Sequence, residues 1–503
     1  MPKPAVPIDP TDLVAEEVSS RGRRDAVLLA GVLLACVTVP TAVSGSGVAL
    51  PAIAADTGGG ATSLQWVVNA FNLAFAASTL LAGSLADLFG RQRGFAAGVG
   101  LFLAASLLSA LAPSILVLDA ARALAGIGAA AIFACGSALL AVRFEGPRQA
   151  RAFALLGTAA GIGLGIGPTV AGGLVDLLSW QAVFGAGAVS AAIVLGLLWV
   201  GRDEEPALRT DASVDVPGSL TFVGGLLLLM VAIVQASEWG WGSASTLGVA
   251  AVAVVALLAF AAIERRGAHP LLDLGLLGDR QLVGLILVPV VAAIGFVTLL
   301  TYLPTYMSTV WGDGTGEAGL KMLLMTVPVV VAPLLAGAAV GRGATPRQVI
   351  VASLALLVAG PALLLPIGPE TSVWLIAPGM IAIGAGFGLG VGLVDGQAIG
   401  RAPADRSGMA AGLVNTSRLG SEAVAVAAYA SLLTSLAAAR ASDGPVRAYD
   451  GALHVVLIGL VGSTFALSAL TAWLLRPAAS QSATARSSTT TPATATTTQG
   501  SPS

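Results

Sequence analysis

The sequence is poor in charged residues. Only 10% of its 503 residues are Asp, Glu, Lys or Arg, whereas an ordinary soluble domain carries about 25%. Two cysteines and two histidines, all far apart, form no metal-ligand spacing, so we expect neither a metal nor another cofactor. The net charge of −2 excludes the broad basic surface that nucleic-acid binding needs. A soluble metalloenzyme and a nucleic-acid-binding protein are therefore both disfavoured.

Lysine is almost absent. Lys3 and Lys321 are the only two, and neither follows a glycine, so the sequence lacks the Gly-Lys-Ser/Thr of a nucleotide-binding P-loop. It also lacks the acidic metal-binding clusters, or the several histidines on one face, that a membrane enzyme such as a lipid transferase would need. We therefore expect that the chain is not an enzyme and keep the membrane enzyme as the disfavoured alternative.

Long apolar runs take the place of charge. Hydrophobic residues make up 56% of the chain and the mean hydropathy is +0.89. A bilayer-spanning helix needs about 20 apolar residues, and a backbone in lipid must satisfy its own polar groups. The runs thus predict an all-α integral membrane protein with about fourteen transmembrane helices. They lie near 26–50, 64–86, 94–112, 114–141, 150–175, 182–200, 217–236, 245–262, 281–304, 318–340, 348–367, 372–394, 408–438 and 453–475.

These spans group as six, two and six. We expect two six-helix bundles with an inserted helical pair, and parallel six-helix halves are a known transporter plan. The predicted parts are a cytoplasmic tail (1–25), an N-terminal bundle (26–200), two inserted helices (217–262), a C-terminal bundle (281–475) and a disordered cytoplasmic tail (476–503). The tails are too polar to fold alone.

The distribution of basic residues predicts the topology. If both ends face the cytoplasm, twenty of the 25 Lys and Arg residues lie on that side. Only Lys321, Arg440 and Arg447 then face outward, and Arg122 and Arg418 lie within spans. This bias follows the positive-inside rule. We expect a multi-pass protein of the cell (inner) membrane with both termini cytoplasmic.

The joint between the second and third spans carries the most specific motif, GSLADLFGRQR at 83–93. Glycines permit a tight turn and close helix approach, and an aspartate at a helix terminus can pair with arginine or cap backbone N–H groups. The motif resembles the signature loop of the major facilitator superfamily. The resemblance implies a conformational-switch loop made of Gly83, Asp87, Gly90, Arg91 and Arg93.

Two further motifs resemble the same superfamily. In LDAARALAGIGAA (118–130), Arg122 matches an intramembrane arginine, while Ala125 replaces the usual glutamine. Such a charge either serves ion transfer or is a structural group bonded to backbone carbonyls. GIGLGIGPTVAGG (161–173) is similar to the motif typical of antiporters. Its matching residues are Gly163, Gly167, Pro168, Gly172 and Gly173.

Matches over roughly 25–475 resemble the fourteen-span drug:proton antiporter branch of this superfamily. The resemblance implies proton-coupled efflux of a drug or antibiotic by alternating access. The partners would be a small drug-like molecule, protons and the lipid bilayer, and we expect a monomer. Abundant Ala, Gly, Val and Arg are typical of a GC-rich genome, so self-resistance in an antibiotic producer is one form of this hypothesis. An exporter or importer of another metabolite remains the alternative.

The first span departs from that branch. Ala42 stands where the branch carries a carboxylate, and Gly47 where it carries an asparagine. Two unusual acids offer replacements: Asp119, three residues before Arg122, and Glu422, four residues after Arg418. Residues at these spacings share a helix face, so we predict two acid–arginine pairs. Asp119 is the favoured proton-coupling residue, Glu422 its rival and Asp395 the third candidate, while purely structural pairs remain the alternative.

Aromatic residues supply the candidates for a drug pocket. Trp66, Phe71, Tyr302 and Tyr306 lie in or beside spans, and Trp311 follows them. They indicate a large apolar or aromatic substrate if they line a central pocket. Positions facing lipid or the core are the alternative.

Overall fold

The computed structural model describes residues 10–58, 61–201, 215–266, 272, 274–403 and 407–476. These residues are helical almost throughout and include no strand, as the apolar runs predict. The elements are α1 (Pro10–Thr57), α2 (Ala61–Phe89), α3 (Arg91–Ala110), α4 (Ile115–Arg143), α5 (Gly146–Leu177), α6 (Trp180–Val200), α7 (Val216–Trp239), α8 (Ala244–Glu264), η1 (Leu274–Gly278), α9 (Arg280–Ala292), η2 (Ala293–Val297), α10 (Thr298–Tyr306), η3 (Met307–Trp311), α11 (Thr315–Gly341), α12 (Pro346–Leu363), α13 (Val373–Gly390), α14 (Leu393–Ile399), α15 (Ser407–Ala439), η5 (Ala441–Asp443) and α16 (Pro445–Leu474).

Within the described residues, thirteen helices are long and apolar enough to cross a membrane. Two of them are composite: α9 to η3 form one span at Arg280–Trp311, and α13 with α14 form another at Val373–Ile399. The predicted span 408–438 coincides with α15, which is not among the thirteen. The all-α membrane fold is therefore confirmed, and the count of fourteen stays a prediction.

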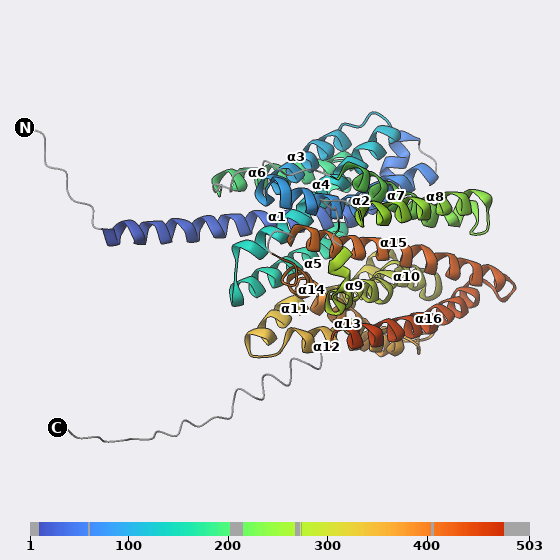
Figure 1. Ribbon diagram of the computed structural model, residues 1–503. Helices are drawn as coiled ribbons and strands as arrows, with labels where there is room; N and C mark the ends of the chain where they lie inside the picture. Colours follow the sequence, from blue (N-terminus) through green and yellow to red (C-terminus); the bar gives the residue numbers. More distant parts are fainter. Residues whose placement is uncertain are drawn as a thin grey trace, which may run out of the picture.

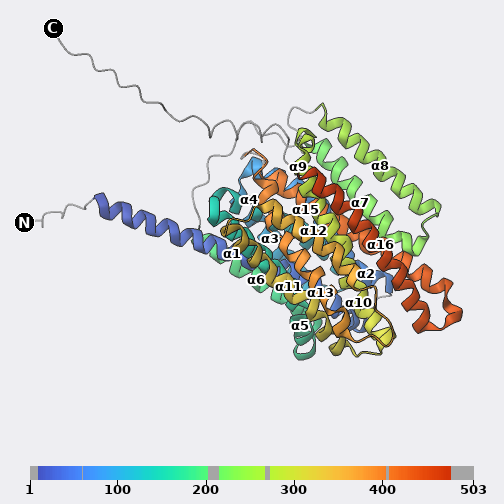
Figure 2. The same ribbon diagram turned by 90° about the horizontal axis from the view of Figure 1, so that it is seen from below.

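Two bundles and a separate helical pair make up the molecule (Figure 1). Helices α1 to α6 pack into the N-terminal half, and α9 to α16 into the C-terminal half. The pair α7–α8 lies at the side, where α7 contacts both α2 and α15 and α8 is outermost (Figure 2). The halves meet mainly along two seams, α2 with α15 and α5 with α11.

One element starts earlier than the sequence predicts. We expected a tail without regular structure over 1–25, yet α1 begins at Pro10. Residues 11–25 contain no proline and run directly into the first apolar span. Extending an existing helix costs far less than starting one, so the polar segment continues the span. The predictions for residues 1–9, His269 and the tail from 477 onward lie outside the described residues.

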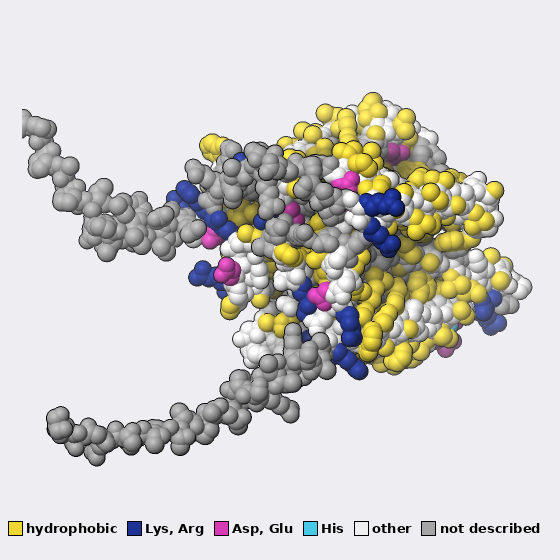
Figure 3. Space-filling view, viewed as in Figure 1, with side chains coloured by type: hydrophobic (Ala, Val, Ile, Leu, Met, Phe, Trp, Pro, Cys, Tyr) yellow, Lys and Arg dark blue, Asp and Glu magenta, His cyan; other side chains and the backbone are white. Residues whose placement is uncertain are grey.

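The charged surface has a clear direction. On the face seen in Figure 3, most basic side chains lie toward the end of the molecule where α1 enters the bundle and α16 ends, and one group lies at the far end. Hydrophobic side chains cover much of the remaining surface. Exposed leucines and valines of α8, such as Leu247, Val255 and Leu258, belong to this apolar surface. Such a surface suits a multi-pass membrane protein whose side faces lipid.

Candidate functional site

The signature loop joins the two halves of the molecule. The Asp87 carboxylate on α2 accepts hydrogen bonds from the backbone N–H groups of Gly408 (3.0 Å) and Met409 (2.9 Å), in the first turn of α15. Arg91 donates to the same carboxylate from one turn along the chain, at 3.0 Å. Asp87 thus caps a helix of the opposite half, where a negative charge also suits the helix dipole.

The other residues of this loop shape the contact. Gly90 has a φ of 102° and separates α2 from α3. Gly83 lies directly against the backbone of Gly408, and Arg93 lies on the exposed surface. The structure therefore brings Gly83, Asp87, Gly90 and Arg91 together at the α2–α15 seam.

A second seam closes the same end of the molecule. Gly392, between α13 and α14, packs on the carbonyl oxygen of Phe153 in α5, which a Cβ on the glycine would approach to 2.2 Å. Deeper in the seam, Gly161 of α5 packs on the backbone of Val329 in α11. In the described chain, the close glycine contacts between the halves all lie in the part of each helix nearer this end. The conformation is closed at the end that carries the signature loop, which we call the closed end.

The antiporter motif packs α5 against α1. A Cβ on Gly163 would lie 2.3 Å from the carbonyl oxygen of Val37, and one on Gly167 would lie 2.0 Å from Oγ of Ser44. By contrast, a Cβ on Gly173 would meet no atom within 4 Å, and the nearest to one on Gly172 would be 3.8 Å away. Pro168 lies inside α5 without interrupting it. Two of the five motif residues thus determine how closely these helices pack.

Arg122 is buried, with 2% of its surface exposed. Its Nε donates to the carbonyl oxygen of Val67 (3.0 Å), and its guanidinium lies 4.3 Å from the ring centre of Phe71. The predicted Asp119–Arg122 pair is not formed: an oxygen of Asp119 and one terminal nitrogen of Arg122 are buried without a hydrogen-bond partner. Helix spacing puts two residues on one face, but an arginine side chain can reach past its neighbour to a carbonyl on the next helix. In this conformation Arg122 therefore fits the structural alternative, a buried charge that is bonded to a backbone carbonyl.

Arg418 also has a partner other than the predicted one. Its terminal nitrogens donate to Asp395 on α14 (2.6 Å) and to Asn415 on α15 (2.8 Å). Glu422 makes no ion pair with it. Asp395, the third candidate for proton coupling, is buried, with 2% of its surface exposed. The chain breaks at Gly392 and continues as the short helix α14, which places Asp395 against α15.

The proposed aromatic pocket is not assembled. Phe71 and Tyr306 are fully buried, and the Tyr306 hydroxyl donates to Asp450 at 2.6 Å. Tyr302 donates to the carbonyl of Val426 at 2.8 Å, and Trp66 packs on the cluster around Met230 of α7. These residues occupy cores and helix seams, the alternative left open by the sequence.

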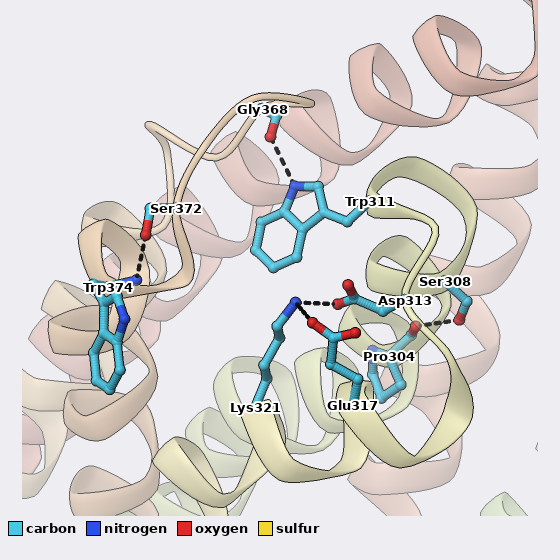
Figure 4. Close-up of polar contacts among 9 residues, drawn as sticks. All are labelled: Pro304, Ser308, Trp311, Asp313, Glu317, Lys321, Gly368, Ser372 and Trp374. Carbon is cyan, nitrogen blue, oxygen red and sulfur yellow. Dashed lines mark hydrogen bonds and ion pairs between the residues drawn. The ribbon is translucent and has the colours of Figure 1, made fainter.

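Sequence reasoning missed a polar cluster at the far end of the C-terminal half (Figure 4). Lys321 pairs with Asp313 (2.6 Å) and Glu317 (2.9 Å), and its ammonium lies 5.1 Å from the ring centre of Trp311. The indole N–H of Trp311 donates to the carbonyl of Gly368 (2.9 Å). The contacts join η3, α11 and the α12–α13 loop. The i,i+4 spacing of Glu317 and Lys321 was the available signal.

No arrangement that could hold a metal ion is found in the described part of the chain. A small pocket adjoins the Arg418 pair. Apart from Arg418, its walls are largely apolar: Val288, Pro289, Ala292, Ser353, Phe387, Gly390, Val391 and Val394. The Arg418–Asp395 pair therefore borders a mostly apolar space.

Comparison with known proteins places these features in a wider group. Residues 32–426 match the family model described as Major Facilitator Superfamily. A puromycin resistance protein of Streptomyces alboniger is 34% identical over 440 residues, covering 85% of this chain and 86% of its own length. A cephamycin export protein of Amycolatopsis lactamdurans is 34% identical over 382 residues, covering 74% and 77%.

The fold also resembles a solved structure. The human organic anion transporter MFSD10 (TETRAN) superposes with a TM-score of 0.64, covering 91% of this chain and 99% of that one. At 16% sequence identity the likeness concerns the fold alone.

Proposed function

We propose that this chain, which belongs to the Major Facilitator Superfamily, exports a drug or antibiotic across the cell membrane by alternating access, driven by protons. The observation that carries the proposal is the Asp87 bridge to the first turn of α15. This bridge is a polar contact between the two halves that can break and re-form, and it lies at one end of the molecule. A transporter that opens alternately to each side needs contacts of this kind.

Two relatives support the choice of cargo. They are named for puromycin resistance and for cephamycin export, and each aligns with about three quarters or more of its own length. Resistance through export requires outward movement of the compound. A drug or antibiotic is therefore the proposed cargo, and self-resistance in a producing bacterium is its proposed setting. The fourteen-span drug:proton branch is the proposed subgroup.

Protons are the proposed energy source. The sequence has no P-loop, and one charge crossing a potential of 100 mV releases about 2.3 kcal/mol. The three candidate acids for this role, Asp119, Glu422 and Asp395, lie on helices α4, α15 and α14. Inside the membrane a protonated carboxyl group carries no charge, whereas an ionised carboxylate has an unfavourable free energy. Proton binding there can therefore favour one conformation.

The orientation follows from the basic residues. We place the closed end, with both termini, in the cytoplasm of a monomeric protein, so the described conformation would be closed toward the cell interior. Export or import of another metabolite is the remaining alternative. It differs from drug export in its cargo and not in its mechanism.

The test uses two measurements on the full chain. A panel of antibiotics, including puromycin and a cephamycin, is applied to a susceptible host that expresses the protein, and we expect reduced susceptibility to at least one. Purified protein in vesicles should then move that compound when a pH gradient is imposed, with protons moving the opposite way. An unchanged panel would contradict drug export, and transport that ignores the pH gradient would contradict proton coupling.

A further inference from the structure

Two carboxylates flank one guanidinium in the C-terminal half. Arg418 binds Asp395 at 2.6 Å and lies against the small pocket. Glu422 follows one helical turn later on α15, at a spacing that puts both side chains on the same face. Glu422 is partly buried, and the described structure gives it no hydrogen bond or ion pair. Arg418 thus has a second carboxylate within reach of a side-chain rotation.

The three groups lie at successive depths. Arg418 is eleven residues into α15 from Ser407, about 16 Å at 1.5 Å per residue, and Glu422 is about 22 Å in. Asp395 is only four residues from the end of α14 at Ile399, about 6 Å. Both Ser407 and Ile399 lie at the closed end. Asp395 is therefore nearest that end, Arg418 comes next and Glu422 is deepest.

The local charge is balanced when Arg418 pairs with one carboxylate and the other carboxyl group is protonated. The single guanidinium neutralises one carboxylate, and that partner is Asp395 in this conformation. A second bare carboxylate within the membrane would be unfavourable, whereas a protonated one carries no charge. Neutrality therefore requires one proton on the carboxylate that Arg418 does not hold.

Neighbouring elements add few groups that titrate. The Tyr302 hydroxyl of α10 donates to Val426, one turn beyond Glu422. The buried Cys36 thiol of α1 is within electrostatic reach of Asp395. Helices α9 and α13 present apolar side chains and Ser417 bonds to the Ile286 carbonyl. No other charged side chain among the described residues pairs with the three groups.

Asp395 is also connected to the contact between the halves. It lies three residues after Gly392, whose φ of 77° marks the break between α13 and α14. Gly392 packs on the Phe153 carbonyl, and Gly396 packs on the Phe153 ring. The short helix that carries Asp395 therefore forms part of the seam that closes this end.

We propose that Asp395, Arg418 and Glu422 form a proton-exchange site with one cation, two carboxyl groups and one proton. This inference rests on the proposed proton-driven export. In the described conformation Arg418 holds Asp395, and Glu422 carries the proton. When Arg418 rotates to Glu422, the proton leaves Glu422 and Asp395 binds it, which keeps the trio neutral. After the cytoplasmic end opens, Asp395 releases the proton there as Arg418 returns to it, and Glu422 then takes a new proton.

Infrared spectroscopy of the purified full-length protein at neutral pH tests the site without any drug. We expect absorption from protonated carboxyl groups in the wild type and the loss of one such band, which defines the Glu422 band, in Glu422→Gln. Asp395→Asn should also abolish the band, although it removes a different residue, because Arg418 then turns to Glu422 and displaces its proton. Asp395→Glu should restore it. Glu370→Gln, at an exposed loop position, is the matched control and should keep the band.

The outcomes separate this inference from the proposed function. If Glu422→Gln removes no protonated-carboxyl band, or if the Glu422 band persists in Asp395→Asn, the exchange site is overturned even if wild-type vesicles move protons. In those vesicles, loss of proton movement in Glu422→Gln with retained drug-for-drug exchange would support it and show that the variant is folded. Should Glu422→Gln lose drug exchange as well, Glu422→Asp must restore proton movement, and its failure would overturn the site. Wild-type vesicles without proton movement would refute the proposed energy source, while the infrared result would still decide the site.

Discussion

Gly83 of α2 and Gly408 of α15 meet backbone to backbone across the two halves. A Cβ on Gly83 would lie 2.0 Å from the Gly408 carbonyl oxygen, and a Cβ on Gly408 would lie 2.2 Å from the Gly83 carbonyl oxygen. Both distances are far below a normal contact, so neither position accepts a side chain unless the helices separate. The closeness also allows Asp87 to reach the first N–H groups of α15.

Gly83→Ala should therefore weaken the closed end. Overpacking a tight contact costs about 1–3 kcal/mol, and here the cost falls only on the conformation in which α2 and α15 touch. We expect a cysteine introduced near the seam, in a variant without Cys36 and Cys135, to react faster with a polar thiol reagent added from the cytoplasmic side. Gly100→Ala is the control, because a Cβ there meets no atom within 4 Å. Equal reactivity in both variants would show that the seam tolerates the methyl group.

Asp87→Ala and Arg91→Ala should abolish transport while leaving expression and substrate binding largely intact. Asp87→Ala removes the cap that bridges the halves, worth about 0.5–2 kcal/mol, and Arg91→Ala removes the group that holds the carboxylate at 3.0 Å. Both residues act on the balance between conformations and lie at the joint between α2 and α3, far from the midpoint of either helix. Drug susceptibility and ligand binding are measured on the same preparations. Full resistance in both variants would show that this loop has no part in switching.

Lys321→Met should destabilise the far end of the C-terminal half. It leaves Asp313, whose side chain is 7% exposed, without its cation. Removing one partner of a fully buried pair costs about 3–5 kcal/mol, and since Lys321 is 20% exposed we expect about 1–3 kcal/mol. Thermal unfolding in detergent measures the loss.

The double variant Asp313→Asn with Lys321→Met should recover part of that stability, because the remaining unpaired carboxylate, Glu317, is exposed to solvent and no buried bare charge is left. A double variant whose loss equals the sum of the two single losses would indicate that the two residues do not interact.

Reporter fusions test the orientation. A fusion after residue 58 or residue 313 should read as external, and one after residue 272 as cytoplasmic, because the basic residues cluster on the opposite side from Lys321. A cytoplasmic reading after residue 58 would contradict the topology on which the direction of proton flow depends.

The sequence predicts the helices better than it predicts their partners. Continuous apolar runs define spans locally, and glycine spacing within a motif identifies tight contacts. The partner of Asp87 is Gly408, 321 residues away in the sequence. No pattern within a short stretch of sequence predicts a contact over that separation. The predicted pairs used spacing along one helix, whereas Arg122 turns to α2 and Arg418 turns to α14.

The same limit explains why the sequence did not predict the roles of the aromatic residues. A tyrosine in a membrane span can line a pocket or bond to a buried carboxylate, and composition does not separate the two. Tyr306 bonds to Asp450, 144 residues further along the chain. Only the packing of α10 against α16 decides between these roles.

The pair α7–α8 makes the molecule asymmetric in the plane of the membrane. Because α7 touches both α2 and α15, it covers one of the two seams from the lipid side, and no equivalent pair belongs to the α5–α11 seam in the described chain. If the halves separate, the α2–α15 seam is held by α7, which contacts both of its helices, whereas the α5–α11 seam has no such helix in the described chain. Any separation of the halves would therefore be larger at the α5–α11 seam than at the α2–α15 seam.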